Sequence, residues 1–238
     1  GAVLALLLVA CSLALRGLQE PAGLPRGARV ADRASDAWRE LRAVLRSRAG
    51  RIGLLLAILP IGTGSAQFLF GSLGPEWNAS ADVVSFVLGI GGGIAIVTGC
   101  MVGGVLASRL PSARAYAVAC TISALAALLL LVSPRNTLGY AASTLTYTFA
   151  LGLCSTTLTG MVLGVIGERA AATKINVFFA MNTMFGLAML RVDGWAHDRW
   201  ATNGMLLVEF GIGAACLLLF VVMERRIRGT EGSAAAPV

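Results

Sequence analysis

The chain has 238 residues, of which 57% are hydrophobic and 13% are charged, and its mean hydropathy is +0.80. Soluble domains carry about 25% charged residues, so a single globular core cannot bury this much apolar surface. The composition excludes a soluble enzyme, a disulfide-rich secreted domain and a disordered tail. It predicts an all-α polytopic membrane protein whose surroundings are the lipid bilayer.

The net charge of +7 is distributed between the apolar blocks of the sequence. We therefore expect lipid headgroups to be the partner of these charges, and we expect no nucleic acid. The five cysteines all lie in apolar segments and include no Cys-x-x-Cys pair. Neither a disulfide nor a metal site is expected from them, because isolated thiols in apolar segments behave as small hydrophobic groups.

In chain order, the first apolar segment is residues 1–15, which is short for a membrane crossing and has no basic region before it. We interpret this segment as the end of a transmembrane helix. Further apolar segments long enough to cross a membrane lie at about 52–72, 82–107, 115–132, 137–166, 172–190 and 203–223. Residues 52–223 are thus predicted to form a six-helix bundle, followed by a polar tail at 224–238.

Residues 16–51 form the one long hydrophilic stretch. Its first part, which contains Pro21 and Pro25, predicts an irregular linker. Four apolar residues then recur at helical spacing between arginines: Ala34, Trp38, Leu41 and Leu45. This pattern predicts a basic amphipathic helix near 28–49 that lies on the lipid surface. The alternative is a solvated connector.

Basic residues are distributed unevenly over the two sides of the predicted spans. All of the 19 Lys and Arg residues except Arg135, Arg191 and Arg199 lie on the side of the hydrophilic stretch and the C-terminal tail. An excess of Lys and Arg marks the cytoplasmic side of a membrane protein. We expect a multi-pass protein of the bacterial cytoplasmic (inner) membrane with its C-terminus in the cytoplasm.

The predicted span at 52–72 contains the sequence Leu-Pro-Ile-Gly-Thr-Gly-Ser-Ala-Gln at 59–67. Pro60 removes a backbone hydrogen bond, so this span is predicted to be a broken helix. Thr63, Ser65 and Gln67 place polar groups beside the break. Interrupted helices point to the binding sites of transporters, and a packing kink without a ligand is the alternative.

The span at 137–166 is unusually rich in hydroxyl side chains. These hydroxyls either line a watery path or bond to carbonyl groups of their own helix. We assign Ser65, Gln67, Thr144, Tyr147 and Thr148 to a substrate path between this span and the broken one. Asn182 is added as a supporting residue, because an amide inside a membrane needs partners.

The span at 82–107 contains two GxxxG pairs, Gly89 with Gly93 and Gly99 with Gly103. Such pairs allow a neighbouring helix to approach closely. We therefore predict close helix packing here and no ligand.

Asp193 and His197 lie between two predicted spans, where they are expected to form an ion pair in a loop on the non-cytoplasmic side. A proton-linked gate is the alternative. A metal site would need more ligands, and a catalytic triad lacks a nucleophile on this side. We expect no enzyme activity, no catalytic residue, no metal and no cofactor.

The stretch from Gly104 to Arg114 resembles the loop motif G-x-L-x-D-R-x-G-R-R of the major facilitator superfamily. It matches the motif at Gly104, Leu106 and Arg109, and Arg114 lies one position after the last arginine of the motif. It departs at Ser108, where the family has the acidic residue of its gating salt bridge, and at Pro111 and Ser112. The order of the spans also resembles the C-terminal half of such a transporter.

This resemblance implies a specific fold and function. Residues 52–223 would be helices seven to twelve, residues 16–51 the basic loop that joins two six-helix bundles, and the N-terminal six-helix half a missing partner. Segments 168–176 and 192–200 resemble the muropeptide-permease-like branch, the peptide–acetyl-coenzyme A–drug transporters. The implied function is secondary active transport of a small solute by alternating access. The implied driving force is a proton, ion or solute gradient.

The resemblance to this branch implies polar or anionic substrates of the muropeptide or acyl-coenzyme A kind. Lys174 at the cytoplasmic mouth would attract such a group, and a simple membrane anchor is the alternative for this residue. Two other classes of function stay open. One is a non-transporting assembly or scaffold protein on the same fold. The other is an intramembrane acyltransferase, which is disfavoured because no His–Asp or Ser–His site lies at membrane depth.

Overall fold

The computed structural model describes residues 64–166 and 171–234, together with isolated positions before residue 48. Every regular element in this part of the chain is helical. The chain divides into two compact units, Gly1–Arg39 and Glu40–Val238. In the first unit, the described positions between residues 6 and 13 are helical and exposed. Within the predicted amphipathic helix, the described positions from Trp38 to Arg46 are also helical and exposed.

The predicted span at 52–72 is described from Gly64 onwards. Gly64 has a left-handed conformation with φ 71°, which glycine adopts without strain. Three short helices follow it: η1 (Ser65–Leu69), α4 (Phe70–Leu73) and η2 (Gly74–Trp77). The described part of this span is therefore a series of short helices of different types, and we call Gly64–Trp77 the interrupted segment. Pro60 and Thr63 lie outside the described residues.

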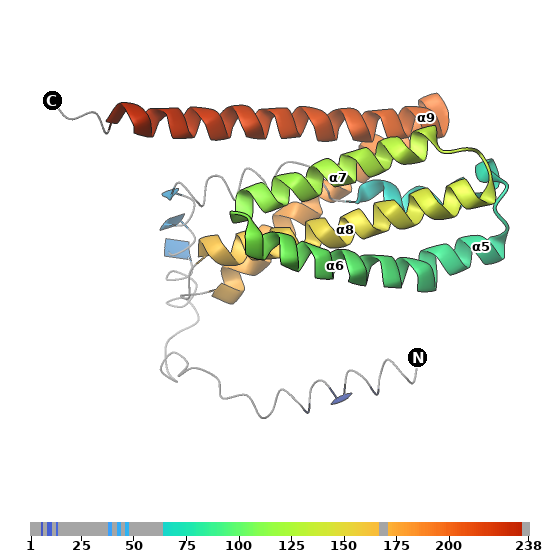
Figure 1. Cartoon of the computed structure of the whole chain (residues 1–238), viewed down its shortest axis with the longest axis horizontal. Helices are drawn as coiled ribbons and strands as arrows, with labels where there is room; N and C mark the ends of the chain where they lie inside the picture. Colours follow the sequence, from blue (N-terminus) through green and yellow to red (C-terminus); the bar gives the residue numbers. More distant parts are fainter. Residues whose placement is uncertain are drawn as a thin grey trace. The chain divides into compact units, whose positions relative to one another are not determined.

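The next three spans are close to their predicted positions (Figure 1). The first is one continuous run made of α5 (Ala81–Phe86), the π-helical turn η3 (Val87–Gly91) and α6 (Gly92–Arg109). It is followed by α7 (Ser112–Val132) and α8 (Thr137–Ile166). Only Leu110 and Pro111 connect α6 to α7, so Gly104, Arg109 and Arg114 of the family-like motif lie in helix ends rather than in a loop.

The last helix, α9 (Ala171–Ala234), corrects the prediction of a loop between residues 190 and 203. It is helical up to Trp200, and the non-helical conformations are confined to Trp200 and Ala201 (φ 53°). The charged residues before this kink are thus part of a helix, because the chain reverses direction over two residues and needs no longer loop. The part of α9 after the kink runs back along α7 (Figure 1).

In the described part of the chain, four helices are long and apolar enough to cross a membrane. The fourth of these, Lys174–Val222, has 49 residues. At 1.5 Å per residue it would measure roughly 70 Å if it were straight, about twice the thickness of a hydrocarbon core. The kink divides this helix into two halves, each of which has the length of one crossing.

Helices α6 and α8 pack at backbone distance through Gly99 of α6 and Gly152 of α8. A Cβ atom on Gly99 would lie 2.1 Å from the carbonyl oxygen of Phe149, and one on Gly152 would lie 2.2 Å from that of Ile96. Gly103 faces α8 in the same way, whereas Gly89 and Gly93 have open space around them. Of the two predicted GxxxG pairs, only Gly99 and Gly103 serve a helix contact within this bundle.

We predict that Gly99→Ala destabilises the protein, whereas Gly93→Ala does not. The added methyl group at Gly99 forces α6 away from α8, which costs about 1–3 kcal/mol, as for other overpacked sites. At Gly93 the methyl group meets no atom and improves helix propensity by up to about 1 kcal/mol. Thermal unfolding in detergent micelles measures both effects. Equal stability of the two variants would contradict the α6–α8 contact.

Candidate functional site

Two acidic side chains of α9 lie at matched distances from its kink. Asp193 is seven residues before Trp200, and Glu209 is eight residues after Ala201. Each carboxyl group is therefore about 10–12 Å along the helix from the kink. Because the chain reverses there, the two groups come to the same level, and Asp193 acts electrostatically on Glu209. We call Asp193 and Glu209 the acid pair.

The interrupted segment and α8 supply hydrogen-bond donors to the acid pair. Ser65 Oγ of η1 donates to Asp193 Oδ2 at 2.6 Å. The Tyr147 hydroxyl group of α8 donates to Glu209 Oε1. The backbone N–H of Ala66 also interacts electrostatically with the Glu209 carboxyl group. Since Ser65 and Ala66 are consecutive, the start of η1 bridges the two carboxyl groups.

The acid pair is buried without a cationic partner. Asp193 is fully buried, and its Oδ1 atom has no hydrogen-bond partner. Glu209 is partly buried, and its Oε2 atom is shielded and also lacks a partner. Among the described residues, no Lys or Arg pairs with either carboxyl group. Unpaired carboxylates are costly at membrane depth, so they mark functional sites.

Aromatic contacts hold the interrupted segment against α8. The rings of Phe70 and Tyr147 meet edge to face with their centroids 5.0 Å apart. The Tyr140 hydroxyl group donates to the carbonyl oxygen of Phe70 at 2.9 Å. Thr144 lies between these two tyrosines along α8, is fully buried, and has an unpartnered Oγ1 atom. This face of α8 therefore forms one wall of the site.

The structure brings together only some of the residues assigned to the substrate path. Ser65 and Tyr147 contact the acid pair directly, and Thr144 lies on the α8 face that carries Tyr147. Gln67 is partly buried on η1. Asn182 is partly buried, but it is 11 residues before Asp193 on α9, roughly 16 Å away along the helix.

Five hydroxyl groups of α8 bond within their own helix. Thr148 donates to the carbonyl oxygen of Thr144 at 2.9 Å. Four others do the same with the preceding turn: Ser143, Thr146, Thr157 and Thr159. For these residues, including Thr148 of the predicted path, the helix itself satisfies the hydroxyl group.

The residues predicted for a cytoplasmic gate lie on other parts of the bundle. Gly104 and Arg109 are exposed near the end of α6, and Arg114 is exposed in the first turn of α7. Lys174 is buried near the start of α9, with a relative exposure of 3%. The neighbouring Glu168 and Arg169 lie outside the described residues.

Two features of the site were not predicted from the sequence. Glu209 was missed, although it is the only acidic residue in the apolar stretch 203–223 and an isolated carboxyl group in such a stretch signals function. Asp193 was noticed but was placed in a loop as an ion-pair partner of His197. That prediction is wrong, because the Asp193 carboxyl group is buried and accepts a hydrogen bond from Ser65.

A second polar cluster lies at the end of the bundle where α9 turns. We call its members the end cluster: Glu76, Trp77, Arg135, Thr202 and Asn203. The Arg135 guanidinium group lies 3.7 Å from the centre of the Trp77 ring and 3.6 Å from Glu76, and it also donates to Asn203. Thr202 donates to Glu76. The cluster thus ties η2, the α7–α8 connection and α9 together.

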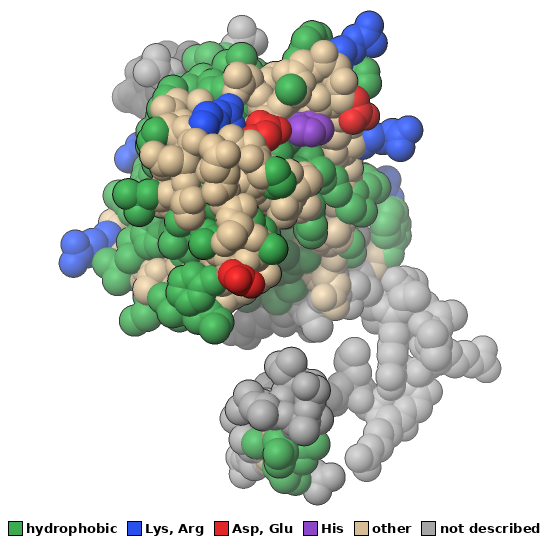
Figure 2. Space-filling view, turned by 90° about the vertical axis from the view of Figure 1, so that its right-hand side faces the viewer, with side chains coloured by type: hydrophobic (Ala, Val, Ile, Leu, Met, Phe, Trp, Pro, Cys, Tyr) green, Lys and Arg blue, Asp and Glu red, His purple; other side chains and the backbone are tan. Residues whose placement is uncertain are grey.

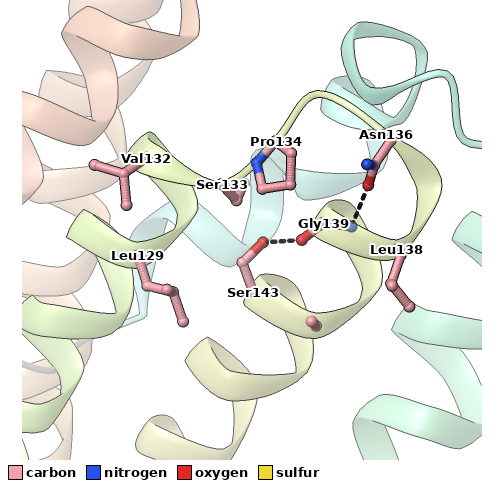
Figure 3. A pocket seen from close by; sticks show the side chains of 9 residues that line it. Leu129, Val132, Ser133, Pro134, Asn136, Leu138, Gly139 and Ser143 are labelled. Atoms are coloured by element: carbon pink, nitrogen blue, oxygen red, sulfur yellow. Dashed lines mark hydrogen bonds between the residues drawn. The ribbon is translucent and has the colours of Figure 1, made fainter.

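Figure 2 shows charged side chains of both signs and the histidine side chain spread over this end of the bundle, with hydrophobic side chains between them and on the flanks. An apolar pocket of about 320 Å³ also lies at this end, between α7 and α8 (Figure 3). Leu129, Val132 and Leu138 supply most of its apolar wall, and the Ser143 hydroxyl group points back to the Gly139 carbonyl group. No residue that lines this pocket belongs to the acid pair.

Among the described residues, no cluster of three or more His, Cys, Asp or Glu side chains could hold a metal ion, and the four cysteines described are free thiols. No protein-family model and no curated protein matches the chain.

We predict that Tyr147→Phe destabilises the protein by about 1–3 kcal/mol, the usual cost of leaving a buried acceptor without its donor. The variant removes the hydroxyl group that donates to Glu209 and keeps the ring that contacts Phe70. Thr146→Val is the control, because this exposed hydroxyl group bonds only to its own helix. Chemical unfolding in micelles compares the two variants. A Tyr147→Phe variant as stable as the control would contradict the hydrogen bond to Glu209.

Proposed function

We propose that the chain is the C-terminal six-helix half of a secondary transporter of the major facilitator type, which moves a small polar solute by alternating access. The observation that carries this proposal is the acid pair, buried inside an apolar helical bundle where an interrupted segment meets a polar face of α8. In a bilayer, irregular backbone and buried charge are tolerated where they line a path or a binding site.

The six-helix count rests on two features of the structure. The kinked α9 has the length of two crossings, and the described end of the interrupted segment packs against α8 and α9. With the three spans between them, these elements would make six crossings. The segment 1–15 would be the end of the preceding helix. The exposed apolar faces of the bundle would contact either the N-terminal half or lipid.

The contacts of the acid pair suit a moving transporter. A hydrogen bond joins η1 to Asp193 in the first half of α9, and another joins α8 to Glu209 in the second half, beside an apolar cluster that includes Ala66, Leu151 and Leu206. Such bonds can be exchanged for bonds to a solute without leaving a cavity in the core. The gradient of an ion or of the solute itself would drive the cycle.

The solute is a polar molecule, and the resemblance to the muropeptide-permease-like branch favours an anionic one. Lys174 near the start of α9 would attract an anionic group, if this end faces the cytoplasm. The alternative function is a non-transporting scaffold or assembly protein. Nothing in a scaffold requires two buried carboxyl groups without a cation, so the acid pair favours transport.

We predict that residues 16–51 and the C-terminal tail are cytoplasmic in the bacterial inner membrane. Cysteines that replace Leu24 or Glu40 in a chain without its native cysteines should react with a membrane-impermeant thiol reagent only after the cells are permeabilised. A cysteine at Asp82, in the exposed first turn of α5, should react in intact cells. Labelling of position 24 or 40 in intact cells would overturn this topology.

We predict that Gln67→Ala and Tyr147→Ala in the full-length transporter impair uptake. Each variant removes a polar group from the proposed path. The loss of one hydrogen bond to a charged group should lower the maximal uptake rate divided by the apparent KM by roughly tenfold or more. Uptake of a radiolabelled anhydro-muropeptide into proteoliposomes, with an uncharged dipeptide as a comparison solute, measures the effect.

Phe68→Ala and Thr146→Ala are the controls for this experiment, because both side chains are exposed on the outside of the bundle. Surface expression of all four variants is checked first. Unchanged rate and affinity in both path variants would remove this site from consideration. Absence of uptake of any solute by the wild-type protein would favour the scaffold function.

A further inference from the structure

We infer that the acid pair binds one exchangeable proton, and that this proton is the ion to which transport is coupled. The inference rests on the proposed function and assigns its driving ion to two residues, Asp193 and Glu209. It starts from the location of the pair: the fully buried Asp193 and the partly buried Glu209, whose Oε2 atom is shielded, lie at matched distances from the kink of α9.

The unpartnered oxygens of the pair have room for a proton. Asp193 Oδ1 and Glu209 Oε2 are both buried and accept no hydrogen bond. When both groups are ionised, two like charges act on each other with no cation among the described residues to balance them, which is unfavourable in a medium of low dielectric constant. A proton that adds to one carboxylate oxygen reduces the charge of the pair from −2 to −1. Its release restores the original charge.

The remaining oxygens are too few for a metal ion. Ser65 and Tyr147 already donate to the other two carboxyl oxygens, Asp193 Oδ2 and Glu209 Oε1. Hard cations such as Ca²⁺ take about six to eight oxygen ligands. The unpartnered oxygens of the site are three, on Asp193, Glu209 and Thr144. A proton needs only one donor and one acceptor, so this set fits a proton.

Proton binding would act directly on the interrupted segment. The bonds from Ser65 and Tyr147 are strong while their acceptors are charged, because hydrogen bonds to ionised groups are roughly twice as strong as neutral ones. Neutralisation of one carboxylate weakens the bond that ties η1 or α8 to α9. The proton thus changes how firmly the two halves of α9 are held to the rest of the bundle.

In the part of the chain that the structure describes, few other titratable groups surround the pair. From α8, Tyr147 contacts Glu209, and Cys154 lies further along the same helix. The start of η1 contributes the hydroxyl group of Ser65 and no titratable side chain. On α9, His197 is one turn after Asp193, and its buried Nδ1 atom has no partner. Glu76 and Arg135 of the end cluster pair with each other.

Infrared difference spectroscopy of the full-length protein in lipid tests this inference without any solute. We expect the carbonyl stretch of a protonated carboxyl group to appear as the pH is lowered, and to be lost or shifted in Asp193→Asn and Glu209→Gln. Asp198→Asn is the matched control, because this exposed acid is on the same helix five residues after Asp193. Replacing choline chloride by sodium chloride at equal ionic strength should leave the signal unchanged.

Two results would overturn the inference. One is a titrating signal that is the same in wild type, Asp193→Asn and Glu209→Gln. The other is a wild-type signal that sodium abolishes, which would assign the pair to a metal cation. Ser65→Ala keeps both acids and should shift the pH midpoint of the titration. This variant replaces Asp193→Asn or Glu209→Gln in the test if either of them does not fold. A titrating pair in a protein that takes up no solute would refute the proposed transport and leave the proton site intact.

Discussion

The hydrogen bond from Ser65 to Asp193 is the contact on which the arrangement of the site depends. In a bilayer, polar groups must find their partners within the protein, and here a residue beside a helix break meets an acid 128 positions later in the chain. Once Ser65 is fixed to the first half of α9, the next residue, Ala66, faces Glu209 on the second half. Tyr147 then closes the site from α8, with its ring against Phe70.

The sequence was sufficient to predict an all-helical membrane chain and the positions of the spans from residue 81 to residue 166, because the length of an apolar run determines whether it can cross a bilayer. It was insufficient around residue 195. Charged residues between two apolar runs are typical of an exposed loop, but Asp193 is held inside the bundle by Ser65. A tertiary hydrogen bond therefore overrides the local pattern, and the helix continues until Trp200.

The candidate site shows the same limit at the level of side chains. The helix break and the hydroxyl-rich span pointed to Ser65 and Tyr147, yet the spacing along α8 did not separate Thr144, whose hydroxyl group is unpartnered, from Thr148, which bonds to its own helix. That difference depends on the neighbouring segment, which the sequence does not specify. The two glycine pairs show the same limit: the sequence pattern is identical, but Gly99 contacts α8 and Gly93 has no atom near it.

The two acidic sites of the bundle differ in a way that suggests a division of roles. Glu76 in the end cluster is 41% exposed and lies beside Arg135, so its charge is balanced at little cost in desolvation. The acid pair, about 10–12 Å further along α9, is buried and has no such partner. Arg135 contacts η2 and the residues just after the kink at the same time. Any motion that opens this end of the bundle toward the acid pair must therefore separate Arg135 from one of these segments.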